Sequence, residues 1–105
     1  MIPQINPDEA RSALDRGALF VDIRDPQSVA QASIIGSVPL QQSNVDSFLA
    51  TTARDQALVV YCYHGHSSLD ATAFLIEQGF SHVHSLSGGF EYWRQRYPET
   101  ITGQP

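Results

Sequence analysis

The sequence predicts an α/β domain built on a mostly parallel sheet with helices on both faces. Short segments rich in β-branched and aromatic residues alternate along the chain with segments of helical periodicity. The β-prone segments are apolar enough to be covered on both faces, as the strands of a parallel sheet are. Right-handed crossovers between such strands place helices on both sides of the sheet. Ligands of these sheets bind beyond the carboxyl ends of the strands.

The first predicted elements are a helix over residues 7–16 and a strand over residues 19–23. Asn6 can cap the helix, and Pro7 suits its first position. Gly17 can end the helix in the left-handed conformation. The strand that follows is continuously apolar up to an aspartate.

A second helix, a weaker strand and a third helix come next. Asp25 and Pro26 predict the start of the second helix. Residues 34–38 predict the weaker strand. Within residues 44–52, three apolar side chains share one helical face, namely Val45, Phe48 and Leu49.

The second half of the chain repeats this alternation. Residues 57–61 form the clearest predicted strand, and residues 68–78 repeat apolar side chains at helical spacing. Residues 83–86 predict the last strand. A final helix is expected over residues 90–96, ending before Pro98.

Length and composition limit the functions that the chain can have. Its 105 residues are enough for one core and too few for two, so one domain is predicted over residues 1–105. The net charge is −5, and the six basic residues, all arginines, are scattered, so no nucleic-acid partner is expected. The apolar runs are far shorter than the roughly 20 residues of a spanning helix, so no membrane contact is expected.

The only cysteine, Cys62, follows the strand over residues 57–61 directly. A lone cysteine at the end of a core strand can be a buried spacer, because free cysteine packs as a small hydrophobe. It can also be a reactive thiol, which requires an electropositive and partly open setting. A spacer does not need the glycine, two histidines and two serines that follow Cys62, so the loop favours the reactive thiol.

A tight loop between a strand and a helix collects backbone N–H groups that stabilise an anion. These amides would hold Cys62 as a thiolate and stabilise a bound anionic substrate. Gly65 permits the turn, Ser67 and Ser68 can cap the helix or donate hydroxyls, and the loop histidines can carry charge. Metal binding by Cys62 with His64 and His66 is an alternative, weakened by how close the three residues lie.

Other polar and aromatic residues are predicted to have structural roles. Asp22, Arg24 and Asp25 could be catalytic, but a buried ion pair or a helix cap at a strand end is the expected role. Packing of the last helix is expected for Phe90, Tyr92 and Trp93, with Trp93 able to border a pocket. His82 and His84 are expected to be structural, and Gly88 with Gly89 is interpreted as a turn.

Three segments together resemble the single-domain rhodanese family. They are Asp22 to Ser28, then the loop Cys62-Tyr63-His64-Gly65-His66-Ser67-Ser68, then Gly88-Gly89-Phe90 with Trp93. The resemblance covers nearly the whole chain in the right order, and the cysteine loop is its most specific part. It implies a rhodanese-like domain with a mostly parallel five-stranded sheet and the active loop at the carboxyl edge.

The resemblance also implies a thiosulfate sulfurtransferase. The Cys62 thiolate would attack the outer sulfur of thiosulfate, release sulfite and hold a persulfide. An acceptor such as cyanide, or a thiol such as reduced thioredoxin, would then take that sulfur. The implied substrate-binding residues are Tyr63, His64, Gly65, His66, Ser67 and Ser68. No metal or organic cofactor is implied.

The chain departs from the family pattern at three places. Ala32-Ser33 replaces a Gly-His pair, His66 stands where close relatives have Asn, and Leu69 replaces a Lys. The missing lysine removes a cation from the loop, and a protonated His66 would supply part of that charge.

Two other functions are weighed against the sulfurtransferase. A noncatalytic carrier that relays sulfur from a partner protein would keep the same loop. A rhodanese-like phosphatase has one more loop residue and an arginine that binds phosphate, and this loop has neither. The N-terminus lacks the pattern of a secretory signal, and a single cysteine fits a reducing compartment, so a cytoplasmic location is expected.

Overall fold

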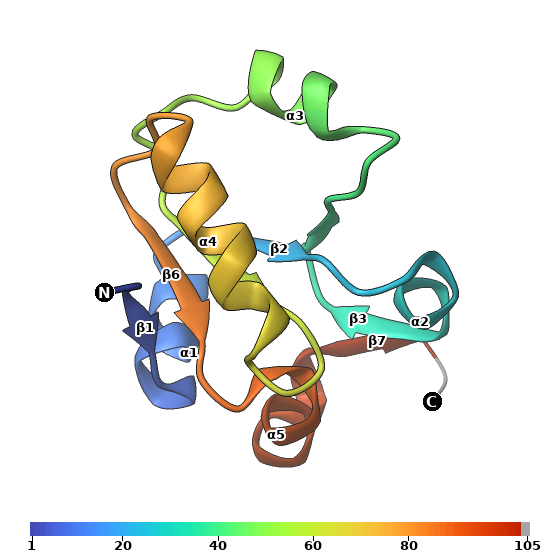
Figure 1. The fold of residues 1–105 in the computed structure, drawn as a ribbon. Helices are drawn as coiled ribbons and strands as arrows, with labels where there is room; N and C mark the ends of the chain where they lie inside the picture. Colours follow the sequence, from blue (N-terminus) through green and yellow to red (C-terminus); the bar gives the residue numbers. More distant parts are fainter. Residues whose placement is uncertain (104–105) are drawn as a thin grey trace.

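A computed structural model describes residues 1–103 and shows a central five-stranded parallel sheet (Figure 1). The strand order is β1-β6-β5-β2-β4. In that order the strands span Gln4–Ile5, Val83–Leu86, Leu58–Tyr61, Leu19–Asp22 and Val38–Pro39. β5 is the middle strand, and both of its neighbours run parallel to it. The carboxyl ends of β5, β2 and β6 therefore open toward the same edge.

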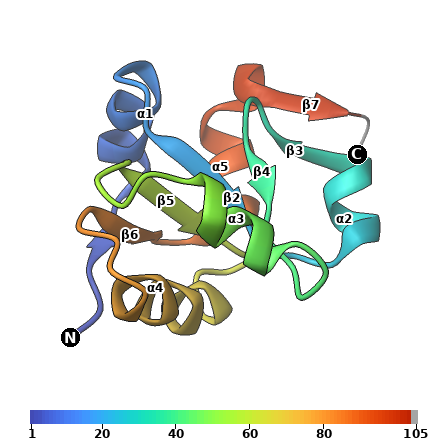
Figure 2. The same ribbon diagram turned by 90° about the horizontal axis from the view of Figure 1, so that it is seen from above.

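Helices cover both faces of the sheet, as predicted (Figure 2). α1 (Pro7–Asp15) and α5 (Gly89–Arg96) lie on one face, and α3 (Val45–Thr51) and α4 (Ser67–Glu77) lie on the other. Successive residues of β5 point to opposite faces, and this alternation divides the core in two. Val59 and Tyr61 pack with Trp93 of α5, and Leu58 and Val60 pack with Leu75 of α4. These contacts belong to two separate buried clusters.

A second, two-stranded antiparallel sheet lies beside the main one (Figure 1). It pairs β3 (Ala32–Ile34), which follows α2 (Pro26–Gln31), with β7 (Ile101–Gly103) near the end of the chain. β7 follows a single 3₁₀ turn, Pro98–Thr100. The predicted strand over residues 34–38 is therefore wrong as one element. Gly36 turns the chain at a φ of +76° and separates β3 from β4.

The other predicted helices and strands are confirmed to within a residue or two at each end. Asn6 forms a capping box at the start of α1: its side chain accepts from the Glu9 amide at 2.8 Å, and the Glu9 side chain accepts from the Asn6 amide. Asp25 caps α2 through the Ser28 amide at 3.1 Å. β1 and β7 were not predicted, because two or three residues carry too little periodicity to be detected.

None of the helices within residues 1–103 combines the length and the apolar character needed to cross a lipid bilayer.

Candidate active site

Cys62 lies at the carboxyl end of the central strand, directly after Tyr61. The chain then turns through residues 63–66 and begins α4 at Ser67. β5 therefore fixes the position of the sulfur, and the start of α4 brings the end of the loop back to the sulfur. The Cys62 side chain is 7 % exposed. Burial alone therefore does not tell a spacer cysteine from a reactive one, and the contacts of the sulfur have to distinguish them.

Two backbone amides donate hydrogen bonds to the Cys62 sulfur. The Gly65 N–H lies 3.2 Å from Sγ and the Ser68 N–H lies 3.3 Å from it. The Ser68 hydroxyl oxygen is also close, 3.4 Å from Sγ. Ser68 lies in the first turn of α4, where backbone amides have no partner within the helix. The sulfur thus occupies the place of a capping group at the positive end of α4.

Of the two roles predicted for the loop serines, side-chain capping of α4 is not observed, whereas the Ser68 hydroxyl does point into the loop. The residue before the helix is His66, and no side-chain hydrogen bond caps that end. The Ser68 amide, which a capping side chain would take, is already bonded to the sulfur. Ser68 instead contacts the Cys62 sulfur twice: its amide donates to Sγ, and its hydroxyl oxygen lies 3.4 Å from Sγ.

These contacts shift the pKa of Cys62. Burial raises the pKa of a thiol, because desolvation disfavours the charged form. Hydrogen bonds from the Ser68 side chain, the Ser68 amide and the Gly65 amide act against burial. They hold the pKa of Cys62 below its ordinary value. The thiolate is the nucleophilic form of cysteine, so this arrangement favours reactivity.

Gly65 and Gly89 allow the loop to lie directly against the turn before α5. Gly65 has a φ of +89°, and a Cβ there would lie 3.1 Å from the Gly88 nitrogen. Gly89 has a φ of +65°, and a Cβ there would overlap the Tyr63 carbonyl and lie 2.7 Å from the His64 nitrogen. A side chain at either position would force the two segments apart.

The first amides of α5 hold the carbonyl groups of the same loop. The Phe90 N–H donates to the Cys62 carbonyl at 2.8 Å, and the Glu91 N–H donates to the Tyr63 carbonyl at 3.0 Å. With its carbonyls bound from behind, the loop directs its N–H groups toward the sulfur. The Gly88-Gly89 turn, interpreted from sequence simply as a turn, is therefore also the support of the loop.

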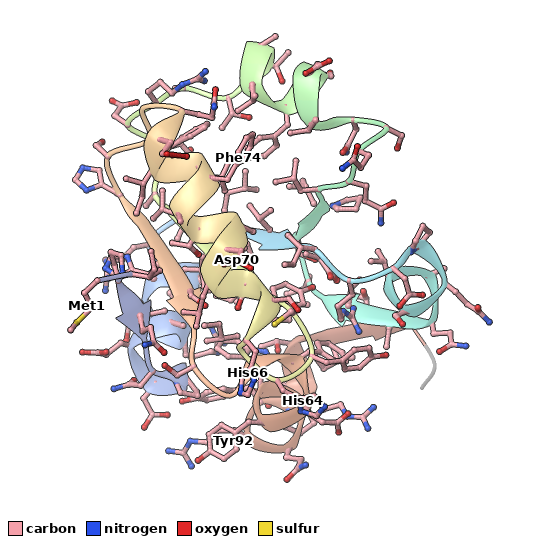
Figure 3. All side chains as sticks on the ribbon, in the orientation of Figure 1. Met1, His64, His66, Asp70, Phe74 and Tyr92 are labelled. Atoms are coloured by element: carbon pink, nitrogen blue, oxygen red, sulfur yellow. The ribbon has the colours of Figure 1, made fainter. Side chains whose placement is uncertain are left out.

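A cavity of about 250 Å³ opens over the sulfur. Its walls are Ile23, Arg24, Asp25, Cys62, Tyr63, His64, His66 and Ser67. Gly65 and Ser68, predicted with them, contact the sulfur but are not part of the cavity wall. Both loop histidines are exposed, and Figure 3 shows them on the outside of the loop between β5 and α4.

The opposite wall of the cavity comes from the segment after β2. Asp22 and Arg24 form the predicted buried ion pair, with Nη2 of Arg24 2.7 Å from Oδ2 of Asp22. Burial opposes the charge of Arg24, yet the Asp22 carboxylate keeps the pKa of Arg24 above its ordinary value. The guanidinium lies over the Phe90 ring at 4.0 Å. Sequence reasoning assigned Arg24 to structure and did not place it at the cavity.

The remaining predicted residues separate into core and surface. Trp93 is fully buried and its indole N–H donates to the Thr100 hydroxyl at 2.8 Å. Packing was also predicted for Tyr92, which is wrong, because that side chain is 51 % exposed (Figure 3). Neither His82 nor His84 lines the cavity. Across residues 1–103, no three side chains of His, Cys, Asp or Glu are grouped so that they could hold a metal ion.

Known proteins similar to this chain share one domain family. The family model of the rhodanese-like domain matches residues 6–96. A protein of Pseudomonas paraeruginosa named thiosulfate sulfurtransferase GlpE is 51 % identical over 96 % of this chain and 93 % of its own. A relative with the same name from Stutzerimonas stutzeri is 48 % identical over 93 % of this chain and 90 % of its own. Among solved structures, the rhodanese-like domain of an Anabaena protein superposes with a TM-score of 0.83. It is 24 % identical and covers 98 % of this chain and 80 % of its own.

Proposed function

Because the chain belongs to the family of rhodanese-like domains, we propose that it is a thiosulfate sulfurtransferase with Cys62 as its sulfur-carrying nucleophile. The observation that carries this proposal is the sulfur itself, bonded to two backbone amides beneath an open cavity. An inert spacer cysteine would have no use for such a setting. The name shared by relatives about half identical to this chain supplies the substrate class.

In the first half-reaction the Cys62 thiolate attacks the outer sulfur of thiosulfate. A sulfur–sulfur bond forms to Sγ, the sulfur–sulfur bond of thiosulfate breaks, and its electron pair leaves on sulfite. The product is a Cys62 persulfide anion. Thiosulfate is repelled at long range by a chain of net charge −5, so attraction has to be local. The loop amides and the positive end of α4 supply it.

In the second half-reaction an acceptor takes the outer sulfur. With cyanide, a carbon–sulfur bond forms, the persulfide bond breaks, and its electron pair returns to Sγ, giving thiocyanate and the thiolate. A cellular acceptor would be a thiol, for which reduced thioredoxin is our candidate. The exposed His64 and His66 border the opening through which such an acceptor approaches.

The test is the intact mass of the protein after exposure to thiosulfate. We expect the mass to rise by one sulfur atom and to return to the starting value on addition of cyanide. Steady-state production of thiocyanate should accompany this change. A persulfide formed only with a partner protein, and no thiocyanate turnover, would instead identify a sulfur carrier. No added sulfur under any of these conditions would refute both.

We further infer that the protein works in the cytoplasm. A reactive thiol that must return to the thiolate after each cycle suits a reducing compartment. Immunodetection in fractionated cells tests this location, and recovery from an oxidising compartment would contradict it.

A further inference from the structure

A buried serine of β6 lies next to the group that holds the sulfur. Ser85 pairs in register with Val60 of β5, so the two side chains lie on the same face of the sheet. Val60 packs in the core that α4 covers. Ser85 therefore points toward α4, and its hydroxyl oxygen lies 2.7 Å from that of Ser68.

Three polar atoms thus form a row that ends at the reactive sulfur. It runs from Oγ of Ser85 to Oγ of Ser68 at 2.7 Å, and from there to Sγ of Cys62 at 3.4 Å. Ser85 and Ser68 are both 0 % exposed. Solvent does not reach either hydroxyl. The Ser68 hydroxyl contacts both Cys62 and Ser85, and the side-chain partner of the Ser85 hydroxyl is Ser68.

The protonation of Cys62 decides which way this row is polarised. A neutral thiol donates to Ser68, and Ser68 then donates to Ser85. A thiolate has no proton to give, and the Ser68 hydroxyl can then donate to the sulfur instead. The Ser68 oxygen is then left as an acceptor, and the Ser85 hydroxyl is the side chain placed to donate to it. Donation from Ser85 strengthens the hydrogen bond that Ser68 gives, because linked hydrogen bonds polarise one another.

We propose that Ser85 is a positioning residue that stabilises the Cys62 thiolate through Ser68, from the buried side of the active site. Its action would matter twice in the sulfurtransferase cycle. The thiolate is the attacking group in the first half-reaction. In the second, the persulfide bond breaks and its electron pair returns to the same sulfur. Ser85 never touches the transferred sulfur in this arrangement.

Other charged and titratable groups face the sulfur from the solvent side. Those that line the cavity are Arg24 and Asp25 after β2, and Tyr63, His64 and His66 in the loop. None of them is a hydrogen-bond partner of Ser85 within residues 1–103. The contribution of Ser85 can therefore be separated from theirs by substitution.

The experiment measures the apparent pKa of Cys62 from the rate of alkylation by iodoacetamide across pH. For Ser85→Ala we expect the pKa to rise, so that alkylation well below the pKa slows about threefold to tenfold, the worth of one hydrogen bond. Ser85→Thr, which keeps the hydroxyl, should restore the parent profile. The matched control is Ser87→Ala, whose hydroxyl bonds the Gln4 side chain instead, and it should titrate as the parent does.

A second background makes the proposal falsifiable even if Ser85→Thr does not fold. Ser68→Ala removes the hydroxyl that links Ser85 to Cys62, so adding Ser85→Ala to this variant should not change the thiol pKa further. An equal shift in both backgrounds would mean that Ser85 acts through general packing, and an unchanged pKa in Ser85→Ala would also overturn the proposal. The inference concerns the site of the proposed function, but alkylation needs no sulfur transfer. A protein that fails to take sulfur from thiosulfate can therefore still support or reject the role of Ser85.

Discussion

At the scale of single residues, Cys62 reconciles burial with charge. A side chain with 7 % exposure would ordinarily keep its proton, yet the hydrogen bonds from Gly65 and Ser68 hold its pKa down. These are backbone amides and hydroxyls, which carry no net charge. A chain without lysine, with its arginines scattered, can therefore still lower the pKa of a buried thiol.

Cys62→Ser tests the sulfur directly. The change removes the thiolate but little volume, so we expect persulfide formation and thiocyanate production to be abolished while the circular dichroism spectrum stays that of the parent. Unchanged turnover in this variant would reject Cys62 as the nucleophile.

The same variant should reveal the pH dependence of stability. The folded-state pKa of Cys62 is depressed, so the parent gains stability as the pH rises from that pKa to the unfolded value of about 8.5. Above that value the gain is constant, and below the folded-state pKa it is absent. A serine hydroxyl does not titrate here. In urea unfolding at several pH values, the free energy of unfolding of the parent should therefore rise relative to that of Cys62→Ser over this pH interval and not at acidic pH. A difference independent of pH would contradict the depressed pKa.

At the scale of elements, most helices and strands and the loop that follows β5 could be predicted from local sequence. The loop from Cys62 to Ser68 is contiguous, and its glycine, serines and position after an apolar strand are visible in the sequence. The amides that bind the sulfur follow from that local geometry. Local sequence was therefore enough to expect a thiolate at the end of β5.

Contacts between distant segments could not be predicted in the same way. Arg24 reaches the cavity from the segment after β2, and Ser85 reaches Ser68 from β6. Arg24 lies within the segment from Asp22 to Ser28 that carries the family resemblance, but nothing local in that segment indicates that its side chain lies at the cavity, and Ser85 stands in no motif. β3 and β7 pair across about two thirds of the chain, and each is only three residues long. Tyr92 was expected to pack because it is aromatic, but its place on α5 faces solvent. These features depend on tertiary packing, which sequence periodicity does not record.

The support of the loop by α5 gives a prediction at this scale. In Gly89→Ala the new methyl group would meet the Tyr63 carbonyl, and alanine would have to adopt a φ of +65°. The left-handed conformation alone costs about 1–2 kcal/mol for a residue with a side chain. We expect stability to fall by at least that amount and the thiol pKa to rise, because the loop amides move away from the sulfur. Urea unfolding and alkylation of Cys62 measure the two effects.

Gly17→Ala is the matched control for that change. Gly17 also has a positive φ, +95°, but a Cβ there would meet nothing within 4 Å. We expect it to lose stability through the backbone conformation alone and to keep the parent thiol pKa. If both glycine variants left the thiol unchanged, the turn before α5 would not be what holds the loop.

At the scale of the whole molecule, two buried polar side chains join the small sheet to the large one. Arg24, paired with Asp22 at the end of β2, donates to the Ala32 carbonyl of β3 at 2.6 Å. The Tyr61 hydroxyl, at the end of β5, accepts from the Ile34 amide at 3.2 Å. The carboxyl edge that carries the candidate active site is thus the edge to which β7 is attached through β3.

This architecture predicts a strong dependence on the Asp22–Arg24 pair. Arg24→Met would leave the Asp22 carboxylate buried without its partner, which typically costs about 3–5 kcal/mol. Adding Asp22→Asn removes the buried charge that has lost its partner. The asparagine side-chain oxygen can still accept a hydrogen bond from the backbone N–H of residue 24, as Oδ1 of Asp22 does at 2.9 Å. We therefore expect the double variant to be more stable than Arg24→Met alone in urea unfolding, a coupling that a double-mutant cycle isolates.

Arg11→Met provides the comparison, because it breaks an ion pair with Asp15 that lies on the surface of α1. Exposed pairs contribute little, so this change should hardly affect stability. Two outcomes would show that the buried pair does not hold the two sheets together. One is an equal loss of stability in Arg11→Met and Arg24→Met, and the other is strictly additive losses of stability for the substitutions at Asp22 and Arg24. A large loss of stability in Arg24→Met alone, partly restored by Asp22→Asn, would show that this buried charge pair beside the candidate active site connects the two sheets.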